Sequence, residues 1–265
     1  MDRVRDEEEM AREIADAPPS RRGFPAVDLA RDALLLDIDG TIIDIAPTPD
    51  QVVVPESLKL NLGRVRERLD GALALITGRM LAAADELFAP LTFAAVGCHG
   101  AELRTAPGGR IEQIARPLSS AEKAAFAEAG KFDPRIRIED KHYTLAIHYR
   151  RVPELENELF GFVNGTLQRL GADLEMVLGK AVIELKPPGV TKGTGLEHLM
   201  TVAPFAGRRP VFFGDDTTDE DAFAVLPKLK GIGVSVGRLL PGADRCVPAP
   251  RDVRNWLAQL AGSRS

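Results

Sequence analysis

Aromatic residues and an excess of positive charge are both scarce in this sequence. One Trp, two Tyr and eleven Phe make up 5% of the 265 residues, and 34 basic against 39 acidic residues give a net charge of -5. Proteins that stack single-stranded bases need aromatic side chains, and most nucleic-acid binders carry a basic stripe. We therefore expect no nucleic-acid partner.

Cysteines and long apolar runs are also few. Cys98 and Cys246 are the two cysteines, and their spacing fits neither a disulfide scaffold nor a metal motif. No apolar run approaches the roughly 20 residues that span a bilayer. The N-terminal segment also lacks the apolar stretch of a signal peptide. These absences predict a cytoplasmic protein with no membrane segment.

Short apolar runs that end in polar residues or glycine alternate with helical patterns in two parts of the chain. The runs ALLLDIDG, ALALITG and TFAAVG are separated by helical spacing over 55–69 and 80–90. The rhythm returns after residue 188, with PVFFGDD and GIGVSVG each followed or preceded by a helical segment. This alternation predicts an α/β fold with a doubly wound parallel sheet.

A segment of different character interrupts that rhythm. RIRIEDK (135–141) and TLAIHYR (144–150) alternate with period two, 155–170 has helical spacing, and 174–187 reads as a hairpin turning at Gly179-Lys180. We predict a core domain in two pieces, 31–104 and 188–263, with an inserted α+β domain over 105–187. Residues 1–30 are predicted to form an N-terminal tail.

Four polar motifs lie at strand or helix ends of the predicted core. They are Asp37-Ile38-Asp39-Gly40-Thr41, Thr77-Gly78-Arg79, Lys192 and Gly214-Asp215-Asp216. In an open α/β sheet, ligands bind beyond the carboxyl ends of the strands. One such motif alone is common in loops, but four in matching positions favour a functional site.

Phosphoryl transfer explains these residue types. A carboxylate can attack phosphorus, and Mg²⁺ can offset the repulsion between the two anions. Asp37 and Asp215 can bind the ion, while Lys192 and the Thr77 hydroxyl can hold phosphate oxygens. Asp39 can protonate the leaving alkoxide and later deprotonate water, and Gly40 permits a sharp turn.

The segment GDDTTDED contains five acidic side chains within seven positions. Asp215 and Asp219 are predicted to belong to the metal site, since a cation would relieve their repulsion. Glu220 and Asp221 fall in the first turn of a predicted helix, where the helix dipole favours acids. For Asp216 both interpretations stay open.

The motifs DIDGT, TGR, TKG and GDDTTDE resemble, in order and spacing, those of the haloacid-dehalogenase-like phosphatases. GDDTTDEDAF, GCHGAELR and the pair EDK and HYR resemble more narrowly the trehalose-6-phosphate phosphatase family. The resemblance covers about 31–260. It implies hydrolysis of trehalose 6-phosphate, with Asp37 as nucleophile and Asp39 as general acid and base. It also implies Mg²⁺ bound by Asp37, the Asp39 carbonyl and Asp215, with Asp219 in the outer shell.

By the same resemblance, the insert would be a mobile cap that supplies the sugar contacts. The candidate substrate-binding residues of the insert are Glu139, Lys141, His148, Arg150 and Glu184, and those of the core are Gly40, Arg79, His99 and Glu102. Alternation places Glu139 with Lys141, and His148 with Arg150, on one face of their strands. The competing interpretation is a solvated sheet face with cross-strand ion pairs; His99 could equally be a hydrogen-bonded loop residue.

Two other functions stay open. One is another capped sugar phosphatase, acting on sucrose phosphate, a mannosyl phosphoglycerate or a hexose phosphate. The other is a non-catalytic module that binds phosphosugars, against which the intact set of Asp37, Asp39, Lys192 and Asp215 argues. We expect a small-molecule substrate and a monomeric protein.

Overall fold

The computed structural model describes residues 22–45, 52–179 and 181–262. The chain divides into two compact units, each described here by itself. The first, called the core unit, comprises Met1–Glu112 and Thr191–Ser265; the second, called the insert unit, comprises Gln113–Val190.

The core unit is built on an eight-stranded sheet with the order β12-β11-β10-β1-β2-β3-β4-β5. Its strands are β1 (Asp32–Leu36), β2 (Leu73–Ile76), β3 (Ala94–Gly97), β4 (Glu102–Arg104), β5 (Glu112–Gln113), β10 (Arg209–Gly214), β11 (Ile232–Val236) and β12 (Arg245–Val247). The six strands from β12 to β3 are parallel, and β4 runs antiparallel to β3. The predicted α/β fold with a parallel sheet is confirmed.

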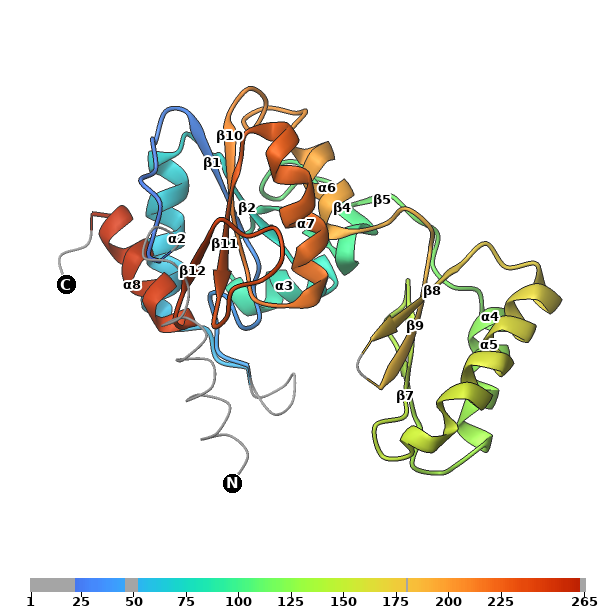
Figure 1. The fold of residues 1–265 in the computed structure, drawn as a ribbon. Coiled ribbons are helices and arrows are strands. Elements are labelled where there is room, and N and C mark those ends of the chain that lie inside the picture. Colours follow the sequence, from blue (N-terminus) through green and yellow to red (C-terminus); the bar gives the residue numbers. More distant parts are fainter. Residues whose placement is uncertain (1–21, 46–51, 180, 263–265) are drawn as a thin grey trace. The chain divides into compact units, whose positions relative to one another are not determined.

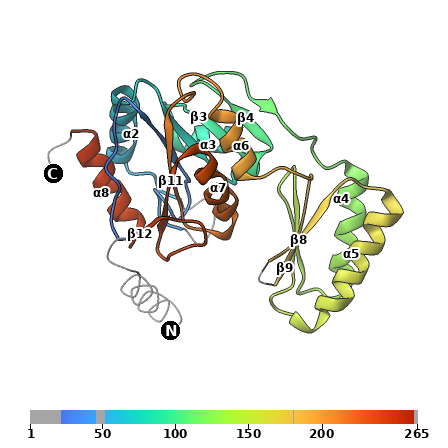
Figure 2. The ribbon, with the colours of Figure 1, turned by 45° about the horizontal axis from the view of Figure 1, so that its top comes forward.

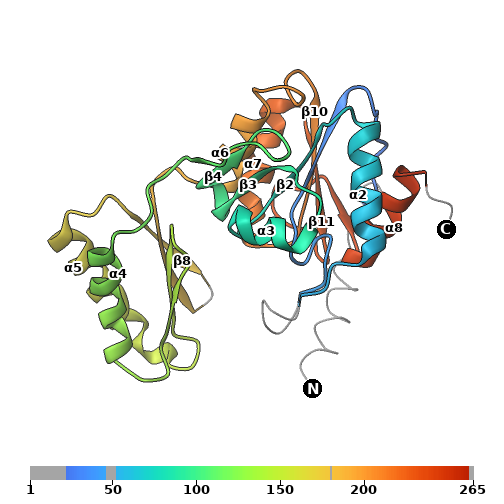
Figure 3. The same cartoon turned by 180° about the vertical axis from the view of Figure 1, so that it is seen from behind.

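Helices cover both faces of this sheet. They are α2 (Glu56–Arg68), α3 (Leu81–Phe88), α6 (Lys192–Leu199), α7 (Glu220–Val225) and α8 (Pro250–Leu260). Figures 1 and 3 show α2 beside α8 on one face and α6 beside α7 on the other. With both faces covered, β1 and β2 are buried along their whole length, which is why they read as unbroken apolar runs.

Parts of the core unit differ from the sequence-based expectation. Strands β4 and β12 were not anticipated. Each is only three residues long and includes charged residues, so neither shows an apolar periodicity in the sequence. Residues 22–30 were expected in the tail, yet Phe24 stacks on Trp256 with ring centroids 5.2 Å apart. The remainder of the predicted tail, 1–21, lies outside the described residues.

The insert unit is a four-stranded antiparallel sheet with the order β6-β7-β9-β8. Its strands are β6 (Arg137–Asp140), β7 (Leu145–His148), β8 (Glu175–Gly179) and β9 (Val182–Lys186). Helices α4 (Ser120–Ala127) and α5 (Glu156–Leu170) lie side by side on one face (Figure 2). The strands and α5 lie where the alternation and helical spacing predicted them, whereas α4 was not anticipated.

The two faces of the insert sheet have opposite character. Leu145, Ile147, Ile183 and Leu185 point into a buried cluster that includes residues of α4 and α5. Because side chains alternate along a strand, Arg137, Glu139, His148 and Glu184 belong to the other face, which is polar. Within the described part of the chain, no helix combines the length and apolar character needed to cross a membrane.

Candidate active site

Two neighbouring strands bring together acids that are far apart in the sequence. Asp37 directly follows β1 and Asp215 directly follows β10, and these strands pair in parallel with Leu36 opposite Phe213. The Asp37 backbone N–H donates to the Phe213 carbonyl over 2.9 Å. As a result, Asp37, Asp215 and Asp219 each place one carboxylate oxygen within 4.8 Å of the others.

Lys192 is a buried cation inside this acidic group. It begins α6, whose N-terminus is capped by the Thr191 hydroxyl. Its Nζ donates to Asp37 Oδ1 over 2.8 Å and to Asp219 Oδ1 over 2.6 Å. Since the three side chains are only 0–6% exposed, each charge depends on the others for compensation.

Burial and mutual repulsion change the proton affinities of this group. Burial, with repulsion from Asp219 and Asp215, raises the pKa of Asp37 well above 3.8 despite the attraction of Lys192. Burial, with repulsion from Asp219, raises the pKa of Asp215 to about 7. Burial would lower the pKa of Lys192, but attraction to Asp37 and Asp219 outweighs it and raises that pKa. The carboxylates thus need more positive charge than Lys192 supplies.

This donor group fits a hard divalent cation. The ligands available are carboxylate oxygens, which Mg²⁺ and Ca²⁺ prefer. Asp219 is less available than the other two: its Oδ1 accepts from Lys192, and its Oδ2 accepts from the backbone N–H groups of Asp215 and Asp216. Asp37 and Asp215 are therefore the carboxylates best placed to contact an ion directly.

Gly40 and Thr41 fix the position of the Asp215 carboxylate. Gly40 has a φ of +79°, and a Cβ added there would lie 2.0 Å from Asp215 Oδ2. The Thr41 hydroxyl donates to Asp215 Oδ1 over 3.1 Å. Thr41 was not among the predicted site residues, although the end of the DIDGT motif carried the signal.

Asp39 is paired with Arg79. The guanidinium donates from Nε and from one terminal nitrogen to the two oxygens of Asp39, both over 2.6 Å. This ion pair raises the pKa of Arg79 through the hydrogen bond to Asp39. The buried Thr77 hydroxyl accepts from the Arg79 backbone N–H, so the TGR motif holds one end of this pair.

His99 lies against the same motif. A Cβ on Gly78 would come within 2.5 Å of two atoms of the His99 imidazole. The His99 backbone has a φ of 55°, and its N–H donates to the Thr77 carbonyl over 3.1 Å. The close approach of the ring requires glycine at position 78.

Glu102, by contrast, is occupied inside the protein. It is buried and accepts a 2.8 Å hydrogen bond from the Leu81 backbone N–H at the start of α3. Its neighbour Arg104 is also buried and donates to both oxygens of Asp85. These contacts support α3, and the substrate role of Glu102 stays a prediction.

The predicted sugar-binding residues of the insert unit gather on its polar sheet face. Glu139 on β6 contacts His148 Nε2 on β7 over 2.9 Å. Glu184 on β9 accepts from the Thr144 hydroxyl over 2.9 Å and lies 3.7 Å from Lys141 Nζ. Arg150 follows β7 and is exposed. The cross-strand ion pairs of the competing interpretation are therefore present, and a sugar-binding role stays a prediction.

The remaining acids of the GDDTTDED segment have local structural contacts. Asp216 is exposed and accepts from the Thr217 backbone N–H and hydroxyl, capping a short 3₁₀ turn. Glu220 and Asp221 lie in the first turn of α7, as the dipole argument predicted. Among the acids of this segment, only Asp215 and Asp219 join the Asp37 cluster.

Comparison with known proteins agrees with this arrangement. The profile of the trehalose-phosphatase family matches residues 35–242. The chain belongs to the trehalose-phosphatase family. It is 39% identical over 89% of its length to a probable trehalose-phosphate phosphatase of Sinorhizobium fredii, covering 90% of that protein. It is 37% identical to the trehalose-6-phosphate phosphatase of Escherichia coli, with 87% of each chain covered.

A solved structure shares the fold of this trehalose-phosphatase family member. The C-terminal domain of C. albicans trehalose-6-phosphate phosphatase superposes with a TM-score of 0.69, covering 99% of this chain and 97% of that one at 22% identity. The haloacid-dehalogenase-like fold implied by the sequence motifs is confirmed.

Proposed function

We propose that this protein hydrolyses trehalose 6-phosphate to trehalose and inorganic phosphate. The observation that carries the proposal is the buried contact of Lys192 with Asp37 beside Asp215, at the carboxyl ends of β1 and β10. The named relatives support the choice of substrate. The location of this activity in the cytoplasm and the monomeric state stay predictions.

Mg²⁺ is the ion we propose for the site, held by Asp37, the Asp39 carbonyl and Asp215, with Asp219 outside the direct ligands. When bound, it supplies positive charge that offsets the repulsion between the phosphate and the carboxylates. The excess negative charge around Lys192, seen in the raised pKa values of Asp37 and Asp215, supports this choice.

In the first chemical step, an Asp37 carboxylate oxygen attacks phosphorus. A P–O bond forms to Asp37, the bond from phosphorus to the sugar oxygen breaks, and Asp39 gives its proton to that oxygen. Lys192 occupies Oδ1 of Asp37, so Oδ2 is the oxygen proposed to attack. We propose that Lys192 and the Thr77 hydroxyl hold the phosphoryl oxygens as their charge grows.

In the second step, Asp39 takes a proton from water and the water oxygen attacks phosphorus. The bond to Asp37 breaks, inorganic phosphate leaves and Asp37 is restored. In the structure, both oxygens of Asp39 accept from Arg79. Asp39 therefore has to leave this ion pair before it donates a proton in the first step.

The departure of Asp39 releases Arg79 to bind the substrate. We propose that Gly40 and His99 also bind the substrate.

We further propose that the insert unit is a cap that reads the disaccharide through Glu139, Lys141, His148, Arg150 and Glu184. Sugar hydroxyls need polar side chains held in fixed positions. The contacts of Glu139 with His148 and of Glu184 with Thr144 provide such positions. The four core motifs are expected to contact only the phosphate group and the metal ion, so the sugar contacts have to come from elsewhere.

Phosphate release from a panel of sugar phosphates, with Mg²⁺ or with EDTA, tests the proposal. We expect strong preference for trehalose 6-phosphate over sucrose phosphate and hexose phosphates, and loss of turnover with EDTA. Metal-dependent release from other sugar phosphates instead would overturn the sugar assignment and retain the phosphatase assignment. No release from any substrate would overturn both.

A further inference from the structure

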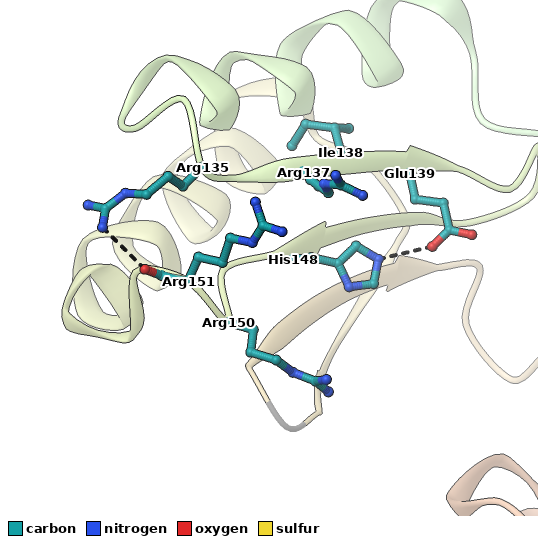
Figure 4. Close-up of a pocket in the computed structure, with 7 residues that line it drawn as sticks. All are labelled: Arg135, Arg137, Ile138, Glu139, His148, Arg150 and Arg151. Carbon is teal, nitrogen blue, oxygen red and sulfur yellow. Dashed lines mark hydrogen bonds and ion pairs between the residues drawn. The ribbon is translucent and has the colours of Figure 1, made fainter. Parts of the chain in front are cut away.

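A pocket on the insert unit is rich in arginine. Its volume is about 640 Å³, and it is lined by Arg135, Arg137, Ile138, Glu139, His148, Arg150 and Arg151 (Figure 4). Four of the seven lining residues are arginines, in a chain whose net charge is -5. Ile138 is the one apolar residue in this lining.

The fold of the insert unit brings these side chains to one end of its polar sheet face. Arg137 on β6 is directly opposite His148 on β7. Arg150 and Arg151 belong to the loop after β7, and the Arg151 carbonyl accepts from Arg135 over 3.4 Å. Figure 4 shows Arg137 and Arg151 extending into the same space, whereas Arg150 extends away from them. Positive charge is therefore gathered by strand pairing and loop structure rather than by adjacency in sequence alone.

The acids around the pocket do not neutralise it. Arg135 pairs with Asp133 over 2.8 Å and approaches Glu154 at 3.7 Å. Glu139, the one acid in the lining, contacts His148 at 2.9 Å and Lys141 at 4.0 Å. Within the described residues, Arg137, Arg150 and Arg151 take part in no ion pair. Three exposed guanidinium groups thus remain uncompensated.

Guanidinium groups suit one class of ligand. Their planar forks match the oxygens of phosphate and carboxylate groups and bind them through paired, charge-assisted hydrogen bonds. Gathering like charges costs free energy, which an anion bound between them would offset. The concave shape and the size of the pocket fall in the range of small-molecule sites.

We propose that this pocket binds a small oxyanion with two or more negative charges, held chiefly by Arg137 and Arg151. The oxyanion group is a phosphate or a carboxylate of a small molecule. Arg150 also belongs to the lining of the pocket and adds its positive charge. The proposal concerns the insert unit alone and does not depend on the catalytic assignment of the core unit.

The test is titration of the full-length, isotope-labelled protein with pyrophosphate, inorganic phosphate and citrate, followed by backbone amide NMR at constant ionic strength. We expect saturable shifts at the amides of 137–139 and 148–151. Binding of phosphate to the core unit would shift the amides of 37–41 instead, which separates the two sites. Saturation by the phosphates alone or by citrate alone supports the proposal and identifies the oxyanion.

Two variants complete the test. R137Q/R151Q should weaken the binding of the saturating anion by about tenfold or more. The matched control is R169Q, which changes an exposed arginine of α5 outside the pocket lining and should leave the affinity unchanged. The circular dichroism spectrum shows whether each variant keeps its fold.

The proposal is overturned if the amides of 137–139 and 148–151 respond to each anion no more than to KCl of equal ionic strength. It is also overturned if R137Q/R151Q, in a folded state, binds as the parent protein does.

Discussion

The core unit and the insert unit handle charge in opposite ways. At the strand ends of the core unit, Asp37, Lys192 and Asp219 are buried and depend on one another. On the insert sheet, Glu139 and His148 contact each other over 2.9 Å, and about half of each side chain stays exposed. Buried charges interact strongly and tolerate little change, whereas exposed charges are screened and can exchange partners. Such a division fits the proposal of fixed chemistry in the core unit and adaptable recognition in the insert unit.

The largest expected effect comes from Asp37→Asn in the core unit. The substitution retains the shape of the side chain but replaces the charged carboxylate with a neutral amide, a much weaker nucleophile, so turnover should fall by about a thousandfold or more. Phosphate release at saturating Mg²⁺ measures it. Asp70→Asn, at an exposed ion pair with Arg208, is the matched control and should retain full activity. Near-normal turnover by folded Asp37→Asn would exclude Asp37 as the nucleophile.

The next effect contrasts buried with exposed lysine. Lys192→Met leaves Asp37 and Asp219 buried without their cation, and should lower the free energy of unfolding by about 3–5 kcal/mol. Lys141→Met removes a partly exposed lysine from the insert sheet and should cost less than about 1 kcal/mol. Urea unfolding followed by circular dichroism measures both. Equal losses in the free energy of unfolding for the two variants would mean that the burial of Lys192 does not make it more important for stability than Lys141.

A smaller effect is expected on substrate preference. Glu139→Gln should lower kcat/KM for trehalose 6-phosphate by about 10–100-fold, since a hydrogen bond to a charged group contributes about 1.5–3 kcal/mol. Hydrolysis of p-nitrophenyl phosphate, which has no disaccharide, should hardly change. Glu128→Gln, at an exposed pair with Lys131 in the same unit, is the control. A parallel loss on both substrates would remove Glu139 from the sugar contacts.

The last effect concerns stability and pH in the absence of metal. The pKa of Asp215 is raised from 3.8 to about 7 by burial, so the folded chain holds a proton that the unfolded chain releases near pH 4. The contribution of Asp215 to the free energy of unfolding is therefore most favourable below about pH 4 and is lost as the pH rises from about 4 to about 7.

Asp215→Asn removes that dependence, because asparagine stays neutral. We expect the substitution to raise the melting temperature more at pH 8 than at pH 5, measured by differential scanning calorimetry with EDTA. Saturating Mg²⁺ should stabilise the parent protein and not the variant. A gain that is the same at both pH values would contradict the origin assigned to the raised pKa.

Much of the core fold could be predicted from sequence because its strands are buried on both faces. Runs such as Leu34–Leu36 carry a clear apolar signal that ends where the polar motifs begin. The short strands β4 and β12 lack such a signal, since sheet pairing and not local pattern forms them. The contact of Thr41 with Asp215, separated by 174 positions, also needs the fold before it can be seen.

The site was predictable in its residue types but not in its pairings. The motifs predicted Asp37, Lys192 and Asp215 together, because the carboxyl ends of parallel strands meet. They did not predict that Arg79 holds both oxygens of Asp39, or that Glu102 accepts a hydrogen bond from the Leu81 backbone N–H at the start of α3. Alternation predicted that Glu139 and His148 are candidate site residues but gave no signal for Arg151, which lines the same pocket from a loop where period two does not apply.

The pairing of β1 with β10 has a consequence for the order of folding. Arg209 and Asp32, which form an ion pair where these strands begin, are 177 positions apart, and the whole insert unit lies between them. Strand pairs that close long loops are slow to form, and local folding of the intervening segment shortens the loop. During synthesis, β10 has to emerge from the ribosome before Asp37 and Asp215 can come together. The insert unit precedes β10 in the chain, so we expect the active site to be one of the last features of the nascent chain to be assembled.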